Sequence, residues 1–353
     1  MKRLLAMAAA SLLMMAPDLS SPAIADEIDD YVRAEMTRQH IPGLSLGIIR
    51  NGQPLRLQGF GLANIEHRAP VHPDTVFQTG SIGKMFTAAA TMLLVEDGRL
   101  ALDAPLSTYL PGTPAAWQDI TLRHLLNHTA GIGRIELDLQ REYTDDELLA
   151  ALYAQPLAFA PGTRWDYSNE GYVLIGILIG KVAGQSYRQI ISERIFLPLG
   201  MRTARPLSDE DIIMNRAAGY EQTPQGHKNQ RWVSRSLNAT ADGSLYMSML
   251  DYVKWDAAVA GRQLLKASSW QQMLAPARLA NGSTRGYGFG WELERTADGR
   301  CVMGHSGGWQ GFLSDMRRYD DDGITFVVLV NTNDADTRAI LQGVAERFDK
   351  RYQ

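Results

Sequence analysis

The chain has 353 residues, of which 45% are hydrophobic and 21% charged, and its formal net charge is −4 at pH 7. This composition is typical of a globular enzyme, and the acidic balance argues against a surface that binds nucleic acid. Because Cys301 is the only cysteine, an intrachain disulfide is excluded, and we expect a buried, inert thiol in a strand.

The N-terminal residues have the pattern of a secretory signal peptide. Lys2 and Arg3 precede an apolar run that ends at Ala16, and small residues follow up to Ala25. We therefore predict a signal peptide at residues 1–25, cleaved after Ala25, and an exported protein that is periplasmic or secreted. The apolar run is too short to span a bilayer, so we expect no transmembrane anchor after signal removal.

The mature chain begins with a predicted amphipathic helix at residues 26–40. Two apolar runs of strand length follow, at residues 44–49 and 55–60. Asn51 and Gly52 lie between them, and this pair is typical of a tight turn in an antiparallel hairpin.

The next segment, residues 77–100, contains a candidate nucleophile. An apolar, Ala-rich helix is predicted from Ser81, with Phe86 and Leu93 among the residues on one apolar side. Ser81 and Lys84 are three residues apart, so the amine can reach the hydroxyl on one helix face. The helix N-terminus would also stabilise an alkoxide or oxyanion, so the pattern predicts an activated serine of the Ser-x-x-Lys kind. The alternative for this motif taken alone is a serine near a helix start with a solvated lysine one turn on.

Predominantly helical segments then give way to strands and a final helix. Helices are predicted at residues 120–128, 145–154, 171–183 and 187–195, strands at 287–293, 300–303, 312–319 and 324–329, and a helix at 335–351. This order indicates a mature domain at residues 26–353 in which both ends of the chain form one α/β lobe. We place that lobe at about 26–78 and 281–353, with a helical lobe at about 79–280 inserted and the site between the two.

Two further motifs could complete a catalytic site. Tyr167 precedes the helix near residue 171, and a nearby lysine ammonium would favour its phenolate, so it could move the serine proton while Asn169 holds the substrate carbonyl or the Lys84 amine. The alternative is that Tyr167 is a loop aromatic that packs on the helix. Gly304 to Gly308 reads GHSGG after a short strand. Its backbone N–H groups could line an oxyanion hole, and His305 could add a donor or a charge for an anionic substrate group.

Competing interpretations exist for two of these patterns. GHSGG also fits the nucleophile elbow of α/β-hydrolases, with Ser306 as nucleophile, but no histidine follows Ser306 to complete that triad. His124 and His128 have the spacing of a zinc pair, but the intervening residues contain no general-base glutamate. We interpret both histidines as structural and predict no metal site and no cofactor.

The three motifs, in this order, make the chain resemble the serine β-lactamase and penicillin-recognising family. The connecting segments are similar as well: ITLRHLLNHTAGI from residue 120, YSNEGYVLIGILIGKVAGQSY from 167, IFLPLGMRTA from 195, YGFGW from 287 and GHSGGWQGF from 304. The resemblance covers about residues 30–335. It implies an antiparallel sheet flanked by terminal helices, with an inserted helical lobe and a cleft between them.

The resemblance also implies roles for individual residues. Ser81 would be the acylated nucleophile, Lys84 its proton partner and Tyr167 the base and acid. Asn169, His305, Ser306 and Gly307 would bind substrate, and the backbone N–H groups of Ser81 and Gly308 would form the oxyanion hole. His305 stands where β-lactamases carry a lysine, and histidine is largely neutral at pH 7, which weakens the expectation of antibiotic hydrolysis.

The function expected from these residues is an exported serine hydrolase that acts through an acyl-enzyme. Its substrate would be a small molecule or peptide, with a D-Ala-D-Ala carboxypeptidase or other D-amino-acid peptidase as one hypothesis and a carboxylesterase as the second. A class C-like β-lactamase is the third. A non-catalytic penicillin-binding or regulatory domain is the alternative from another class.

Overall fold

The computed structural model describes residues 22–352. The predicted signal peptide, residues 1–25, lies outside the described residues except for its last four positions, which begin helix α1 (Pro22–Arg38). No helix within residues 22–352 combines the length and the apolar character needed to cross a membrane.

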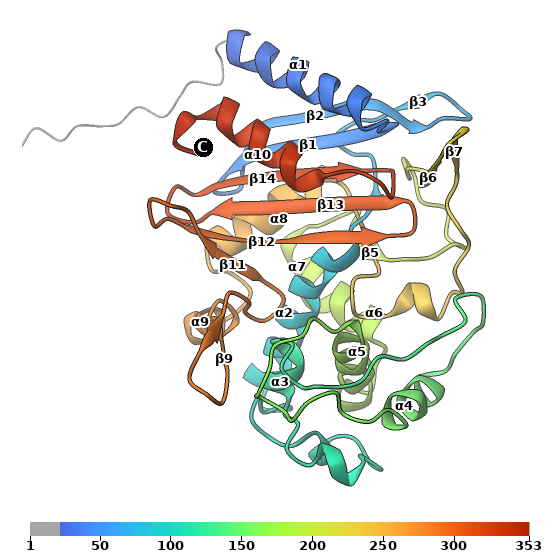
Figure 1. Cartoon of the computed structure of the whole chain (residues 1–353), viewed down its shortest axis with the longest axis vertical. Helices are drawn as coiled ribbons and strands as arrows, with labels where there is room; N and C mark the ends of the chain where they lie inside the picture. Colours follow the sequence, from blue (N-terminus) through green and yellow to red (C-terminus); the bar gives the residue numbers. More distant parts are fainter. Residues whose placement is uncertain (1–21, 353) are drawn as a thin grey trace, which may run out of the picture.

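The fold is built on one seven-stranded sheet in which neighbouring strands are antiparallel, in the order β11-β12-β13-β14-β1-β2-β3 (Figure 1). Its strands are β1 (Gly43–Arg50), β2 (Gln53–Asn64), β3 (Ala69–Pro70), β11 (Glu292–Arg295), β12 (Cys301–Trp309), β13 (Phe312–Tyr319) and β14 (Ile324–Val330). The two ends of the chain therefore meet where β1 pairs with β14, as the order of predicted elements indicated.

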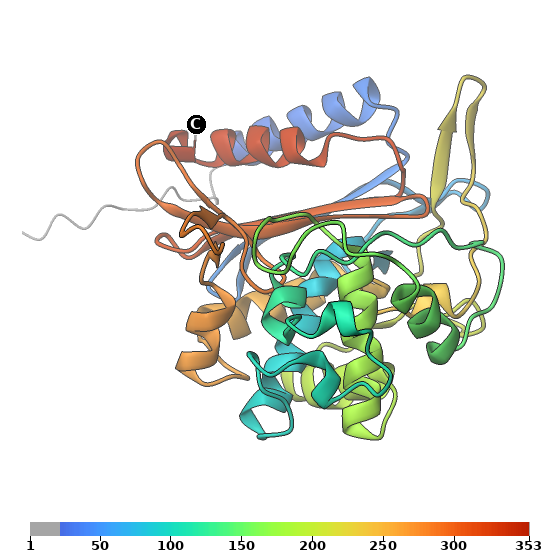
Figure 2. The same ribbon diagram turned by 60° about the horizontal axis from the view of Figure 1, so that its bottom comes forward.

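Helices cover both faces of this sheet, as the edge-on view in Figure 2 shows. One face packs against α1 and α10 (Thr337–Phe348), with Ile48 and Phe326 in that core. The neighbouring residues Ile49 and Val327 belong to the core on the opposite face. Because both faces are buried, the central strands are nearly continuous apolar runs rather than alternating ones.

The opposite face carries the helical part of the chain. Its helices are α2 (Gly83–Glu96), α3 (Leu122–Leu126), α4 (Asp145–Tyr153), α5 (Asn169–Ala183), α6 (Tyr187–Ile191), α7 (Leu197–Leu199), α8 (Met249–Ala260) and α9 (Ala267–Met273). Every residue of α2 from Gly83 to Leu94 is buried. This helix therefore lies in the middle of the core, whereas its sequence pattern predicted a single apolar side.

Several details differ from the predicted elements. A strand was predicted at residues 287–293, but β11 covers only Glu292–Arg295. Strand β12 extends to Trp309 through the whole GHSGG segment. The part of the chain between the outer strands also contains short strands: β4 (Phe77–Gln78), β5 (Arg205–Pro206), β6 (Tyr220–Thr223), β7 (Gly226–Asn229), β8 (Leu245–Met247), β9 (Ala277–Arg278) and β10 (Thr284–Arg285). Cys301 lies at the start of β12 and is only partly buried.

The predicted fold class is confirmed, since an antiparallel sheet flanked by terminal helices carries a largely helical layer on its other face. The division into two lobes near residues 78 and 281 stays a prediction.

Candidate active site

Ser81 lies in a short 3-10 turn, η1 (Gly80–Ile82), that leads into α2. Two hydrogen bonds hold Thr79, which directly precedes this turn. Its N–H donates to Leu245 O at 2.9 Å, and its carbonyl oxygen accepts from Ser314 Oγ at 2.7 Å. Gly80 has φ +53°, which favours glycine, and directs the chain from β4 into the turn. The nucleophile candidate is thus fixed between the sheet and the central helix.

Lys84 is fully buried, and its amine lies within hydrogen-bond distance of three acceptors. Nζ is 3.2 Å from Ser81 Oγ and 2.8 Å from Asn169 Oδ1, and it also donates to the backbone oxygen of Asp242. Burial lowers the pKa of Lys84 to about 8, although the Asp242 and Glu170 carboxylates act in the opposite direction. A neutral amine, able to accept the Ser81 proton, is therefore accessible near physiological pH.

Tyr167 sits directly before α5, where the Ser168 hydroxyl caps the helix by accepting from Gly171 N at 3.0 Å. Lys84 Nζ lies 4.9 Å from the centroid of the Tyr167 ring. Burial nevertheless raises the pKa of Tyr167 well above its usual value, and a contact with the Ser81 hydroxyl only partly offsets this. Tyr167 is therefore a neutral phenol, which corrects the expectation that the nearby lysine would favour its phenolate.

The GHSGG segment forms the edge of β12 that faces Ser81. Strand β11 pairs with β12 only as far as Gly304, so the ladder between these two strands ends before Ser306. A Cβ atom at Gly307 would lie 2.1 Å from Thr79 O, and one at Gly80 would lie 2.4 Å from Gly308 N. Only glycines allow this approach, which places the N–H groups of Ser81 and Gly308 beside each other.

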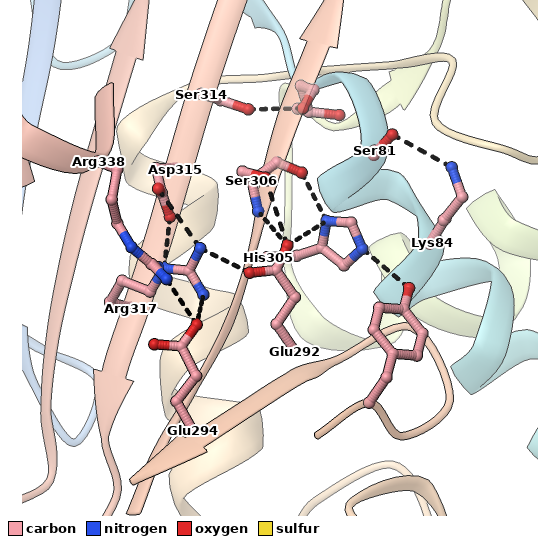
Figure 3. Close-up of polar contacts among 12 residues, drawn as sticks. Ser81, Lys84, Glu292, Glu294, His305, Ser306, Ser314, Asp315, Arg317 and Arg338 are labelled. Carbon is pink, nitrogen blue, oxygen red and sulfur yellow. Dashed lines mark hydrogen bonds and ion pairs between the residues drawn. The ribbon is translucent and has the colours of Figure 1, made fainter. Parts of the chain in front are cut away.

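His305 is buried, with both ring nitrogens engaged by the protein (Figure 3). Nε2 is 2.8 Å from the hydroxyl of Tyr287, and Nδ1 is 2.5 Å from Ser306 O. A neutral ring satisfies both contacts if Nδ1–H donates to the carbonyl and the Tyr287 hydroxyl donates to Nε2. Burial lowers the pKa of His305 to about 4, although Glu292 opposes this. His305 therefore offers neither charge nor a free donor, contrary to the expected contact with an anionic substrate group.

Ser306 is exposed, and its hydroxyl lies 3.3 Å from Glu292 Oε1. Glu292 in turn pairs with Arg317 at 2.7 Å, and Figure 3 shows this ionic group beside His305. Ser306 lies inside a continuous strand rather than at a strand-to-helix turn, so the nucleophile-elbow interpretation is wrong.

Tyr287 and His128 also belong to the site, although neither was predicted there from the sequence. His128 is buried, with its ring centroid 4.4 Å from that of Tyr167 and 4.6 Å from that of Tyr287. Its Nδ1 accepts from Ser168 N at 3.1 Å, and burial keeps its pKa well below the usual value. Both residues occur in segments that resemble the family, and this resemblance was the only sequence signal that could have assigned them to the site.

His124 and His128 each accept a backbone hydrogen bond through Nδ1. His124 Nδ1 accepts from Thr121 N at 3.3 Å in the cap of α3. The described residues contain no group of three or more metal-ligating side chains.

A protein-family model described as Beta-lactamase matches residues 28–347 of the chain. Penicillin-binding protein 4* of Bacillus subtilis (strain 168) is 32% identical over 299 residues, which cover 79% of this chain and 66% of that protein. The D-aminopeptidase of Gluconobacter oxydans (strain 621H) is 26% identical over 342 residues, which cover 94% of this chain and 64% of that protein. The chain thus spans less than two thirds of the length of either relative.

Among solved structures, a similar one is the D-amino acid amidase from Ochrobactrum anthropi SV3, determined with L-phenylalanine amide. It has a TM-score of 0.78 and 27% sequence identity, and the match covers 92% of this chain and 96% of the amidase.

Proposed function

The chain belongs to the β-lactamase family and is a serine hydrolase of that superfamily, and from this premise we propose that it hydrolyses amides or esters of D-amino acids through an acyl-enzyme on Ser81. The observation that carries the proposal is the Lys84 amine, 3.2 Å from Ser81 Oγ and with a pKa of about 8. Export by the segment at residues 1–25 is part of the proposal.

In the acylation step, Ser81 Oγ attacks the substrate carbonyl carbon while the neutral Lys84 amine takes the hydroxyl proton. The new C–O bond turns the carbonyl oxygen into an oxyanion, which the N–H groups of Ser81 and Gly308 stabilise. Asn169 Oδ1 holds the Lys84 amine at 2.8 Å and so keeps it aimed at the serine.

The leaving group departs when its bond to the carbonyl carbon breaks. The Tyr167 hydroxyl gives the leaving atom a proton and takes one from the Lys84 ammonium, so the phenol stays neutral overall. Water then attacks the carbonyl carbon of the acyl-enzyme, and Tyr167 and Lys84 move the protons in the reverse direction. The bond to Ser81 Oγ breaks, which releases the acid and restores Ser81 and Lys84. Deprotonation of Tyr167 before attack is disfavoured by its raised pKa.

The neutral His305 supports the choice of substrate. A substrate with a carboxylate next to the scissile bond, such as a D-Ala-D-Ala peptide or a β-lactam, needs a positive charge or a free donor. His305 offers neither, because its pKa is about 4 and both ring nitrogens are engaged. We therefore favour amides, peptides and esters without that carboxylate.

A carboxylesterase is the second candidate function, since the same groups cleave an ester and an alkoxide leaves more readily than an unprotonated amide nitrogen. Hydrolysis of β-lactams and a purely penicillin-binding role are less favoured, the latter because Ser81, Lys84 and Tyr167 are all in place.

The proposal is tested by labelling the mature chain with a fluorescent fluorophosphonate and comparing wild type with Ser81→Ala. We expect covalent label on the wild type only. Turnover should then decrease across four substrates in this order: a D-amino-acid p-nitroanilide, a short-chain p-nitrophenyl ester, an acyl-D-Ala-D-Ala peptide and a chromogenic cephalosporin. Label on the Ala variant, or no turnover of any of the four, would refute the proposal.

A further inference from the structure

Tyr167, the proposed proton donor, belongs to residues 164–168, which form neither helix nor strand and lead into α5. Beyond the contact of its hydroxyl with Ser81, no hydrogen bond within residues 22–352 orients the buried phenol. Its position is therefore set by the backbone of this segment and by the rings packed on it. Because proton transfer requires hydrogen-bond distance between the two heavy atoms, the groups that hold this segment bear directly on catalysis.

His128 holds the backbone on both sides of Tyr167. Its carbonyl oxygen accepts from Asp166 N at 2.9 Å, and its ring Nδ1 accepts from Ser168 N at 3.1 Å. These are the amides of the two residues that flank Tyr167 in the chain. One residue therefore restrains the chain immediately before and immediately after the phenol.

The ring of His128 also packs on the phenol itself. Its centroid lies 4.4 Å from that of Tyr167, with the two planes tilted by 42°, and 4.6 Å from that of Tyr287. The Tyr287 hydroxyl is in turn held by His305 Nε2 at 2.8 Å. Because the imidazole is buried in contact with both phenols, it cannot turn away from Ser168 without displacing one of them.

The contact with Ser168 requires a neutral imidazole that carries its proton on Nε2, since Nδ1 accepts only through a free lone pair. Burial, together with the charge of Lys84, keeps the pKa of His128 well below its usual value and so keeps the ring neutral. Nε2 is buried without a hydrogen-bond partner in the described part of the chain. The bond to Ser168 N is therefore the only hydrogen bond that the ring makes there.

The backbone of His128 is unusual for a histidine. The residue follows α3 and its C-cap Asn127 with φ +62°, and glycine and asparagine adopt this left-handed conformation most readily at a helix end. The helix end is completed by main-chain atoms, with Thr129 N donating to His124 O at 2.8 Å. Ending α3 thus gives no reason for an imidazole at this position, whereas the ring contacts with Tyr167 and Ser168 do.

We propose that His128 is a positioning residue for Tyr167. By holding the two flanking amides, it fixes the phenol at the distance needed to protonate the leaving group, and it takes no part in the proton transfer itself. The inference rests on the proposed function, in which Tyr167 gives the leaving atom its proton. A defect at His128 should therefore matter chiefly for substrates whose leaving group needs that proton.

The test compares two substrates with the same acyl group, 3-phenylpropionyl p-nitroanilide and 3-phenylpropionyl p-nitrophenyl ester. The anilide nitrogen must gain a proton to leave, whereas p-nitrophenolate leaves as a stable anion. The ratio of kcat/KM for the anilide to kcat/KM for the ester thus reports protonation of the leaving group, while the ester alone reports attack by Ser81. Tyr167→Phe, which removes the donor, should lower this ratio about 100-fold or more.

Two substitutions separate the hydrogen bond of His128 from its ring. His128→Gly tolerates the positive φ but removes the acceptor, and it should lower the ratio about tenfold or more. His128→Asn also tolerates that φ and can place an amide oxygen close to the position of Nδ1, so its ratio should stay within about threefold of the wild-type value. His124→Asn is the matched control, because His124 Nδ1 accepts from a backbone amide in the cap of α3, away from Tyr167, and its ratio should be that of the wild type.

Combining His128→Gly with Tyr167→Phe shows whether His128 acts through Tyr167. The ratio for the double variant should then equal that for Tyr167→Phe alone. A further tenfold fall in the double variant would overturn the positioning role.

The tautomer of His128 can be measured in the wild type, so this result does not depend on how any variant folds. The nitrogen NMR spectrum of the histidine rings should show His128 with a bare Nδ1 and a protonated Nε2, and the signal is assigned by its loss in His128→Asn. A proton on Nδ1 would overturn the inference, because the ring could not then accept from Ser168 N.

An unchanged ratio in folded His128→Gly, or an equal fall in His124→Asn, would also overturn it and leave the serine hydrolase proposal in place. An unchanged ratio in Tyr167→Phe would refute the proton donor on which the inference rests. Failure of the whole proposed function looks different, since then neither substrate is turned over and Ser81 takes up no fluorophosphonate.

Discussion

The charge of Asp242 should set the pH at which the enzyme becomes active. Lys84 must be neutral to take the Ser81 proton, and the Asp242 carboxylate raises the Lys84 pKa by favouring the ammonium. The substitution Asp242→Asn removes that charge and keeps an oxygen that can accept from Thr240 Oγ1, while the backbone contact to Lys84 is unaffected. The acidic limb of the kcat/KM profile should therefore move to lower pH.

The size of the effect follows from the Lys84 pKa of about 8 in the wild type. At pH 7 only about 9% of the enzyme then carries the neutral amine, and kcat/KM falls about tenfold for each pH unit below the limb. Full deprotonation at pH 7 would raise kcat/KM about elevenfold, which is the upper limit for the variant. At pH 9 and above the variant and the wild type should converge.

The assay is the pH dependence of kcat/KM with 3-phenylpropionyl p-nitroanilide, which has no titrating group of its own between pH 5 and 10. Glu136→Gln serves as the control, since Glu136 is not among the charges that act on Lys84, and its limb should stay at about 8. A limb in Asp242→Asn that coincides with the wild type, or moves to higher pH, would show that Lys84 is not the general base.

Three other substitutions test the fold and the site. Asp256→Ala removes the buried carboxylate that lies 2.7 Å from the Arg318 guanidinium, which is 3% exposed and keeps Asp320 at 2.8 Å as its second carboxylate partner. Urea unfolding should therefore show a loss of about 3 kcal/mol, and a loss below about 1 kcal/mol would contradict this. The pKa of His305 is about 4 in the folded protein, below its unfolded value, so the free energy of unfolding should fall by up to about 3 kcal/mol as the pH drops from 6.5 to 4. His305→Gln should lose this component of the pH dependence. Parallel profiles of stability against pH for the variant and the wild type would argue against it. Gly307→Ala places a Cβ atom 2.1 Å from Thr79 O and should move the N–H groups of Ser81 and Gly308 apart. We expect kcat to fall about 100-fold while the protein stays folded. An unchanged kcat would exclude these two N–H groups as the oxyanion hole.

Local sequence patterns predicted most of the sheet and the longer helices. The Asn51-Gly52 turn between β1 and β2 is the clearest case, because both residues have positive φ, at 47° and 76°. The same reasoning placed β13 at residues 312–319. It failed for β12, since the three glycines in GHSGG do not favour a strand locally and are ordered by pairing with β13, and Gly304 with β11 as well.

The candidate site could be predicted as a set of residues but not as a set of charge states. Ser81 and Lys84 lie together because they are three residues apart, and this needs no tertiary information. The phenol of Tyr167 and the ring of His305 stay neutral because they are buried, and burial depends on distant segments such as the one that carries Tyr287. Reasoning from single residues favoured a phenolate for Tyr167. For His305 it left a charge open, although histidine is largely neutral at pH 7.

The burial of α2 on all sides also bears on how the protein fails when it is heated. A helix without a solvent-exposed face cannot unfold locally while the residues around it remain folded. Local unfolding of α2 therefore cannot separate the Ser81 hydroxyl from the Lys84 amine. Residual activity after a heat challenge should therefore track the fraction of molecules that remain native, with no population that is structured yet inert.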